Sequence, residues 1–189
     1  MIFLTVDVSA LRVLVFGTGT VGSRKAAYFR DEAKEVRLLE KAESPSDDAA
    51  LLSLISEYDI IIAASDDAEF NKKITDIASQ NHKWYNSATA VGNFLLPAVF
   101  YEGDLSLAVS TNGKAPAVAS FIRDEIKSAY PALPQMVELQ NTLRTLLKNN
   151  IPSQKQRAEV LQKVLHDNEI WKELEEGSFN AEEILRRYV

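Results

Sequence analysis

A glycine-rich turn that follows a short apolar segment constrains this chain more than any other feature. Residues 13–25 read VLVFGTGTVGSRK, so a buried strand would run into glycines at positions 17, 19 and 22. The first glycine suits a tight turn, the second lets a diphosphate approach the backbone, and the third lets a helix pack on the strand. The N–H groups that begin this helix would face the phosphates. The pattern predicts a dinucleotide site made by Gly17, Thr18, Gly19, Thr20, Val21 and Gly22.

An acidic residue closes the next apolar stretch, where Val36-Arg-Leu-Leu is followed by Glu40. A carboxylate at about this distance from the glycines is typical of a ligand for ribose hydroxyls, and it would repel the 2′-phosphate of NADP. The pair of features therefore favours NAD as the cofactor. Two alternatives stay open: Arg24 or Lys25 offers a counter-charge for a 2′-phosphate, and Glu40 also suits a solvated strand end.

The composition excludes several classes of protein. The chain has 189 residues, no cysteine, two histidines and a formal net charge of −6. Without cysteine there is no disulfide, Fe–S cluster or thiolate metal site, and the two histidines lie in different halves, so no metal site is expected. The negative charge argues against a nucleic-acid partner. No apolar run approaches the roughly 20 residues that span a bilayer, so we expect no membrane partner and a cytoplasmic location.

The order of apolar segments predicts an α/β fold. Short β-branched runs alternate with helical stretches in the first part of the chain, which is typical of a parallel sheet. We expect strands near 13–16, 36–39, 60–63, 84–86 and 105–110, and helices near 22–30, 46–56 and 71–81. The apolar run 94–101, which Pro97 interrupts, could be a further strand. Glu102-Gly-Asp104 predicts a hairpin turn between antiparallel strands.

The chain changes character after residue 112. Pro116 suits the first turn of a helix, and the rest of the chain has helical patterns, including an apolar stripe at Met136, Leu139, Leu143, Leu146 and Leu147. We predict a Rossmann-like nucleotide-binding domain (1–112), a linking segment (113–134) and a small all-helical C-terminal domain (135–189).

Polar residues next to the expected strand ends are further candidates for a site. Ser65 and Asp66 follow a buried strand, and Asn86 ends another, so both places should face the cofactor crevice of a parallel sheet. Local helix capping explains these polar residues about equally well. A loop of small residues with a lysine precedes the helix at Pro116 and suits an anion, although a solvated surface loop is the alternative.

Several motifs occur together in one order and spacing, and this set resembles the precorrin-2 dehydrogenase family, which includes the dehydrogenase/ferrochelatase module of sirohaem synthases. The resemblance covers residues 1 to about 130. It rests on Arg24-Lys25-Ala26 after the glycine loop, Ala63-Ala-Ser-Asp-Asp67 with Asn71, Asn86, Asn93-Phe-Leu-Leu-Pro-Ala98, Gly103-Asp-Leu105, and Ser110-Thr-Asn-Gly-Lys-Ala-Pro116 leading to Ile122-Arg123.

The resemblance implies an NAD-dependent oxidoreductase of porphyrin and sirohaem biosynthesis that oxidises precorrin-2 to sirohydrochlorin. In some members the same cleft then inserts ferrous iron. It also implies a homodimer formed through the middle segment, so that residues 113–134 would be a linking and dimerisation segment. Asn86 and Ser87 would lie in the catalytic cleft. Carboxylates of the tetrapyrrole would meet Ser110, Thr111, Asn112, Gly113, Lys114 and Arg123.

One position departs from the family pattern. The family has an aspartate seven residues before the Phe of the Phe-x-x-Pro segment, and counting back from Phe94 reaches Ser87. A serine hydroxyl does not act as a base at neutral pH unless another base activates it. The departure bears most on iron insertion, which needs an acceptor for two pyrrole protons. It keeps open a second reading, a nucleotide- or tetrapyrrole-binding protein of the same fold without turnover, and a third, a Rossmann dehydrogenase or sensor for another substrate.

Overall fold

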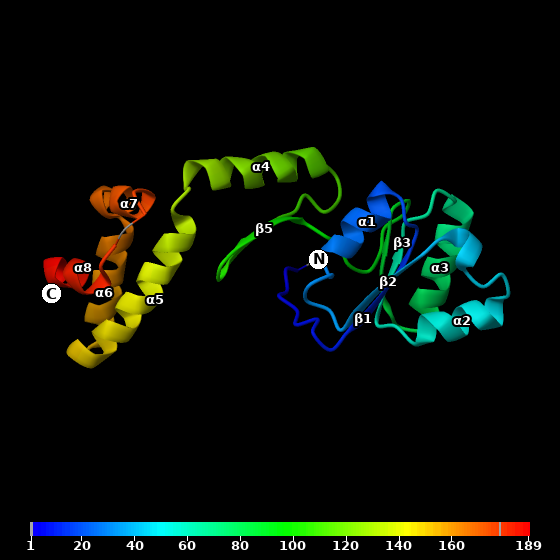
Figure 1. The fold of residues 1–189 in the computed structure, drawn as a ribbon, viewed down its shortest axis with the longest axis horizontal. Helices are drawn as coiled ribbons and strands as arrows, with labels where there is room; N and C mark the ends of the chain where they lie inside the picture. Colours follow the sequence, from blue (N-terminus) through cyan, green and yellow to red (C-terminus); the bar gives the residue numbers. More distant parts are fainter. Residues whose placement is uncertain (1, 178) are drawn as a thin grey trace. The chain divides into compact units, whose positions relative to one another are not determined.

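The computed structural model describes residues 2–177 and 179–189, and it divides the chain into two compact units that meet between Leu96 and Pro97. Each unit has its own core, and each is described by itself. The elements of the first unit are β1 (Arg12–Phe16), α1 (Thr20–Ala27), β2 (Glu35–Leu39), the 3₁₀ turn η1 (Lys41–Glu43), α2 (Asp48–Ser56), β3 (Ile60–Ala63), α3 (Ala68–Gln80) and β4 (Trp84–Ser87) (Figure 1).

The sheet of the first unit is parallel, in the order β2-β1-β3-β4. Val13 of β1 pairs with Val36 on one side and with Ile60 on the other. Strand β3 and four of the five residues of β1 are buried, as expected for strands covered on both faces. Because the chain goes from β1 to β2 on one side and then returns to β3 on the other, the strand order reverses between β1 and β3. That reversal opens a crevice at the carboxyl ends of these two strands.

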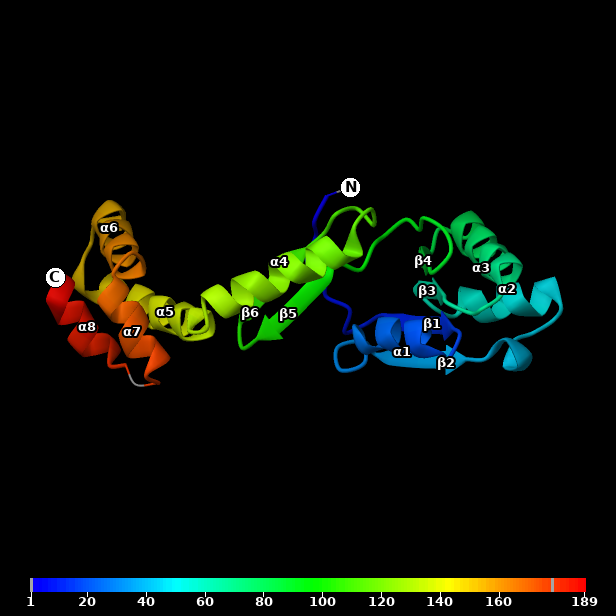
Figure 2. The same ribbon diagram turned by 90° about the horizontal axis from the view of Figure 1, so that it is seen from above.

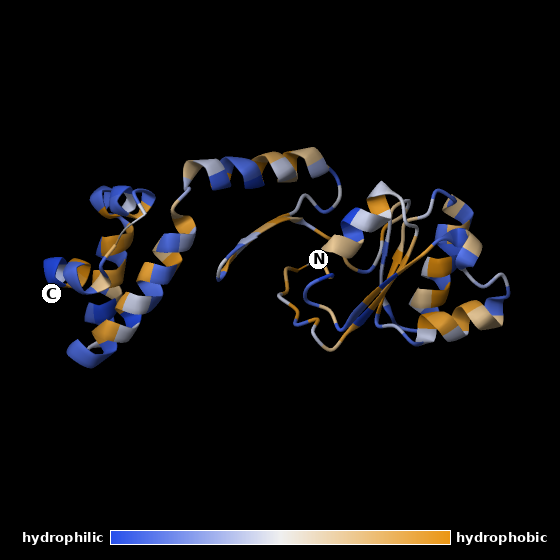
Figure 3. Cartoon of the chain, in the orientation of Figure 1, coloured by the Kyte–Doolittle hydropathy of each residue, from blue (hydrophilic) through white to orange (hydrophobic). Residues whose placement is uncertain are grey.

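Successive side chains of each strand point to opposite faces of the sheet, and different helices cover the two faces. Val13, Val15, Ile60 and Ile62 pack against α1. The residues between them face α2 and α3, and this second cluster contains Leu14, Phe16, Ile61, Ala63, Leu51, Ile55, Ile74 and Ala78. Figure 3 shows the apolar colouring concentrated along these strands and on the sides of the helices that meet them. Both faces are therefore closed by helices, and ligands have access to the sheet at its strand ends.

The second unit begins with an antiparallel hairpin, β5 (Ala98–Glu102) and β6 (Leu105–Val109), as the sequence predicts. Gly103 turns the hairpin with φ +56°. Helix α4 (Pro116–Ala129) packs along the hairpin (Figure 2). These contacts group residues 98–109 with α4, whereas the sequence analysis places them with the nucleotide-binding segment. The three-part division of the chain stays a prediction.

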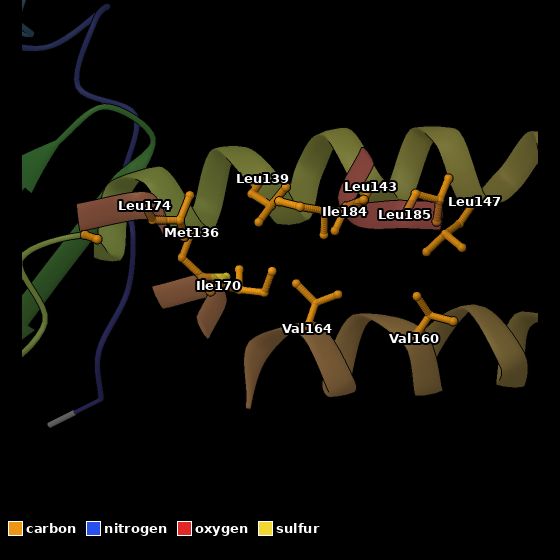
Figure 4. Packing of buried hydrophobic residues seen from close by; sticks show 11 residues of the cluster. Met136, Leu139, Leu143, Leu147, Val160, Val164, Ile170, Leu174, Ile184 and Leu185 are labelled. Carbon is orange, nitrogen blue, oxygen red and sulfur yellow. The ribbon is translucent and has the colours of Figure 1, made fainter. Parts of the chain in front are cut away.

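The last four helices form a small bundle. They are α5 (Leu133–Asn150), α6 (Gln154–Leu165), α7 (Asn168–Glu175) and α8 (Ala181–Tyr188). The predicted stripe on α5 faces Val160 and Val164 of α6, together with apolar side chains of α7 and α8 (Figure 4). Ser153 and Asn180 cap α6 and α8, because their side chains accept hydrogen bonds from the first turns of these helices. Among the described residues, no helix is both long and apolar enough to cross a membrane.

Candidate active site at the carboxyl ends of the sheet

The glycine loop after β1 touches the loop after β3. Gly17 has φ +114°, and its N–H donates to the carbonyl oxygen of Leu39 at 2.8 Å. A Cβ atom at this position would lie 2.3 Å from the carbonyl oxygen of Ala64. Any side chain at position 17 would therefore separate β1 from β3 at the crevice, besides requiring a backbone conformation that L-residues rarely adopt.

The other two glycines have different environments. A Cβ at Gly22 would lie 1.9 Å from the carbonyl oxygen of Gly17, so α1 packs directly on the loop. A Cβ at Gly19 would meet no atom within 4 Å. Gly19 is also the N-cap of α1, which has no side-chain cap and no acidic residue in its first turn. The backbone at Gly19, Thr20 and Val21 is thus open to an anion, and it fits the diphosphate of a dinucleotide.

Glu40 lies beside this loop, at the end of β2. Its Oε1 accepts a hydrogen bond from Thr18 Oγ1 at 3.0 Å. Its backbone N–H donates to Glu43 Oε2 at 2.9 Å, as part of a capping box on η1. The Glu40 side chain also accepts from the backbone N–H of Glu43 in the same capping box. Together with the Thr18 hydrogen bond, this contact holds an exposed carboxylate next to the glycine loop, where it fits the ribose hydroxyls of a dinucleotide.

The loop after β3 is organised mainly by internal hydrogen bonds. Ser65 Oγ donates to Oδ1 of the buried Asn71 at 2.9 Å, and Asn71 Nδ2 donates back to the Ser65 carbonyl oxygen. Asp67 caps α3 and forms an ion pair with Lys41, whose hydrogen bond holds the pKa of that carboxyl below its usual value. Asp66 is exposed beside them. The helix therefore begins at Ala68, three residues earlier than expected. The buried role of Asn71 was missed by the sequence analysis.

Asn86 is 4% exposed and points to the face of the sheet that α1 covers. Its Nδ2 donates to the carbonyl oxygen of Phe94 at 2.9 Å, which turns Oδ1 toward the helix. There it accepts a 2.5 Å hydrogen bond from Lys25 Nζ. Burial lowers the pKa of Lys25 to about 8, and the charge of Arg24 adds to this shift. The sequence predicts Lys25 only as a counter-charge for a phosphate, because its contact with Asn86 depends on how α1 packs on the sheet.

Ser87, the last residue of β4, has its hydroxyl engaged in the following turn. Its Oγ accepts hydrogen bonds from the backbone N–H groups of Thr89 at 3.1 Å and Ala90 at 3.2 Å. It also lies 3.3 Å from Thr89 Oγ1. Within residues 2–177 and 179–189, no carboxylate or imidazole makes a hydrogen bond with it. The local geometry gives the Ser87 hydroxyl a structural role in this turn, and among the described residues no basic side chain is hydrogen-bonded to it that could activate it.

The remaining predicted residues belong to the second unit. Asn112 and Gly113 have φ values of +53° and +76° in the turn before α4. The hydroxyls at either side are used locally, because Ser110 Oγ accepts from Asn112 N and Thr111 Oγ1 accepts from Ala115 N, both at 3.0 Å. Lys114 is exposed.

On α4 itself, Arg123 donates through Nε to Oδ1 of Asp124 at 2.8 Å. The structure thus brings together the predicted residues of the first unit at one edge of its sheet. The turn at residues 110–115 and Arg123 form a second group of predicted residues, which lies in the second unit.

Comparison with known proteins gives matches along most of the chain. Residues 4–98 match a family described as "Putative NAD(P)-binding", and residues 102–129 match one described as "Sirohaem biosynthesis protein central". A precorrin-2 dehydrogenase of Methanosarcina barkeri is 32% identical, over 95% of this chain and 89% of the relative. Siroheme synthase 1 of Pectobacterium atrosepticum is 28% identical over 78% of this chain, which spans 34% of that longer protein.

A solved structure described as "SirC, precorrin-2 dehydrogenase" has a similar fold. Its TM-score to this chain is 0.72 at 24% identity, and the match covers 100% of this chain and 98% of the other. The Rossmann-like α/β fold that the sequence predicts is therefore confirmed. The family model over residues 4–98 also makes the first unit an NAD(P)-binding domain.

Two glycine substitutions should separate folding from cofactor binding. Gly17→Ala should lower the free energy of unfolding by roughly 2–4 kcal/mol, because it adds both backbone strain and a clash. Gly19→Ala should change it by less than about 1 kcal/mol, yet weaken NAD(P) binding about 10-fold or more by filling the space for the diphosphate. Urea unfolding followed by circular dichroism and titration calorimetry with NAD would measure these effects. Unchanged NAD affinity in Gly19→Ala would contradict this assignment of the site.

Proposed function

This chain belongs to the precorrin-2 dehydrogenase family, and from that premise we propose that it oxidises precorrin-2 to sirohydrochlorin with NAD⁺ as the hydride acceptor. The observation that carries the proposal is the open backbone at Gly19 and the start of α1. The alignment to a named precorrin-2 dehydrogenase, which covers 95% of this chain, supports it. The nicotinamide, when bound, supplies the hydride chemistry. The protein supplies binding, orientation and local charge.

The choice of NAD over NADP rests on Glu40. Its carboxylate is fixed by Thr18 and by the capping box of η1, so it cannot turn away from a 2′-phosphate without breaking these bonds. The nearest lysine in sequence, Lys41, is paired with Asp67. A phosphate at this place would meet one fixed negative charge, whereas a ribose diol would gain a charged acceptor.

The tetrapyrrole side of the proposal rests on the turn before α4 and on Arg123. The substrate carries several carboxylates, and the turn offers an exposed Lys114 at the start of a helix whose N-cap, Ala115, has no side-chain cap. Arg123 already has a partner in Asp124, so it would bind a substrate carboxylate in competition with that residue. Iron insertion stays a prediction that rests on the family resemblance alone, because position 87 has a serine where the family pattern has an aspartate.

The proposal includes a homodimer and a cytoplasmic location. Helix α4 exposes three apolar side chains on one face, at Val118, Phe121 and Ile122, and Phe121 is 62% exposed. Tyr101 on the neighbouring hairpin is 68% exposed. Residues 102–129 also match the central family of sirohaem biosynthesis proteins. Burial of these side chains against a second copy would remove apolar surface from water, and this is what supports α4 as the dimer contact.

The purified protein should produce NADH when precorrin-2 and NAD⁺ are added. The expected result is a rise of NADH absorbance together with the spectrum of sirohydrochlorin. Gly19→Ala, which should fold but bind NAD weakly, serves as the matched control. Tight binding of sirohydrochlorin without NADH formation would overturn the proposal in favour of the non-catalytic binding protein.

Glu40→Gln should reduce the preference for NAD. The amide keeps the shape of the side chain but loses the charge, so a hydrogen bond to a charged group worth about 1.5–3 kcal/mol is weakened. We expect the Kd for NAD to rise about 10-fold or more and the Kd for NADP to fall. Calorimetry with both cofactors measures this, and Asp76→Asn on the exposed side of α3 is the charge-matched control. An unchanged ratio of the two affinities would remove Glu40 from the site.

Phe121→Glu should convert the protein to a monomer. The substitution places a charge in the exposed apolar face of α4 without touching the two described cores, so the fold should persist. Sedimentation velocity measures the change. Leu52→Glu, at an apolar position on α2 that is 39% exposed, is the control and should leave the dimer intact. A wild-type protein that sediments as a monomer would contradict this part of the proposal.

A further inference from the structure

Building on the dehydrogenase activity proposed above, we propose that the Nζ amine of Lys25, positioned by Asn86, accepts the proton that the tetrapyrrole loses during its oxidation. No role beyond charge was expected for this lysine. It lies on α1, just after the glycine loop, and reaches Asn86 near the end of β4, on the face of the sheet that α1 covers. It is a titratable group at the end of the strand where the family pattern has a carboxylate, although it lies on the face of the sheet opposite to the side chain at position 87.

The reaction requires a proton acceptor in addition to a hydride acceptor. Removing two hydrogens from a reduced tetrapyrrole breaks one C–H bond, whose electron pair leaves with the hydride to the nicotinamide. It also breaks one N–H bond of a pyrrole, whose electron pair stays in the ring system as a new double bond forms. The released proton binds to the lone pair of the Lys25 amine, which becomes an ammonium group and later returns this proton to solvent.

The hydrogen bonds around Lys25 favour this role. Nζ lies 2.5 Å from Oδ1 of a neutral amide, and that amide is itself fixed by the carbonyl oxygen of Phe94. A neutral acceptor holds the nitrogen in place in both of its protonation states, whereas a carboxylate would hold the ammonium form. In the described part of the chain, no carboxylate forms an ion pair with Lys25.

The helix that carries Lys25 packs on an apolar face of the sheet. Helix α1 packs on β1, β2 and β3, and the residues in this cluster from those strands are Val13, Val15, Val36, Leu38, Ile60 and Ile62. Arg24 is the charged neighbour that acts on Lys25. Burial and this like charge both disfavour the ammonium form, and they bring the pKa of Lys25 to about 8, close to the range in which a base works best.

The other titratable groups at this edge have different roles. Asp67 is paired with Lys41 and caps α3, which lowers the pKa of its carboxyl and makes it a poor base. Glu40 accepts from Thr18 beside the glycine loop. The Ser87 hydroxyl accepts two backbone N–H bonds. Lys25 combines partial burial, a neutral partner and a site beside β4, and these three features together support its assignment.

The first test compares Lys25→Arg and Lys25→Met with the control Lys72→Arg. Lys72 is an exposed lysine of α3 that pairs with Asp76, and its replacement should leave kcat unchanged. Arginine keeps the positive charge but does not titrate near neutrality. A base role predicts that both Lys25 variants lose about 100-fold or more in kcat. A Lys25→Arg enzyme that keeps the wild-type kcat would overturn the proposal and make Lys25 a site for a substrate carboxylate.

The pH dependence has opposite signs for the two roles. A base must be neutral, so kcat should rise with pH and level off above about 8. A cation that binds a carboxylate would instead lose affinity as pH passes 8, and KM would rise there. A kcat that does not change between pH 6 and pH 9, or that falls, would contradict the base role.

A measurement without turnover completes the test. In protein labelled with ¹³C-lysine, one Cε resonance should titrate near 8 and should be absent in Lys25→Arg. Asn86→Asp should move this titration, and the rise of kcat, to higher pH, because it places a carboxylate beside Nζ; circular dichroism checks that this variant folds. A Lys25 resonance that titrates near 10.5 would overturn the inference even if precorrin-2 is oxidised. A wild-type protein without turnover would overturn the proposed function as well.

Discussion

The contact between the loops after β1 and β3 is the constraint on which the site depends. A main-chain carbonyl of Ala64 occupies the space where a side chain of Gly17 would be, and the carbonyl of Gly17 in turn occupies the space beside Gly22. These close approaches join two strands and one helix through backbone alone. At this edge of the sheet Gly17 and Gly22 are in close backbone contact, whereas the space beside Gly19 is empty. The packing that joins the two strands and α1 therefore also leaves room for a ligand beside Gly19.

Much of the fold follows from local patterns. The strands at β1 to β4, the hairpin at Gly103 and the caps at Ser153 and Asn180 could all be predicted, because alternation, turn residues and capping side chains act within a few positions. The ends of α1 and α3 were placed two or three residues off, and the cap at Asp67 explains the second difference.

The site was predicted in part for the same reason. The glycine loop and Glu40 are readable from spacing, since each acts through its own backbone or the end of its own strand. The pair of Lys25 and Asn86 was not predicted as a pair, because it depends on which face of the sheet α1 covers and on the parallel register of β3 and β4. Asn71 was missed for a similar reason, since its burial is set by the packing of α3 and not by its neighbours in sequence.

The boundary between the two units has a consequence for how such a chain can evolve. The match to the NAD(P)-binding family ends at residue 98, the match to the central family begins at 102, and the two units meet between 96 and 97. The apolar clusters of the sheet and of the C-terminal helices each lie within one unit. A joint made by recombination near this place would therefore leave both clusters intact. The boundary therefore allows the dinucleotide unit and the second unit to be inherited as separate modules. A longer protein also contains a related segment, because the match to siroheme synthase 1 of Pectobacterium atrosepticum covers 78% of this chain and 34% of that protein.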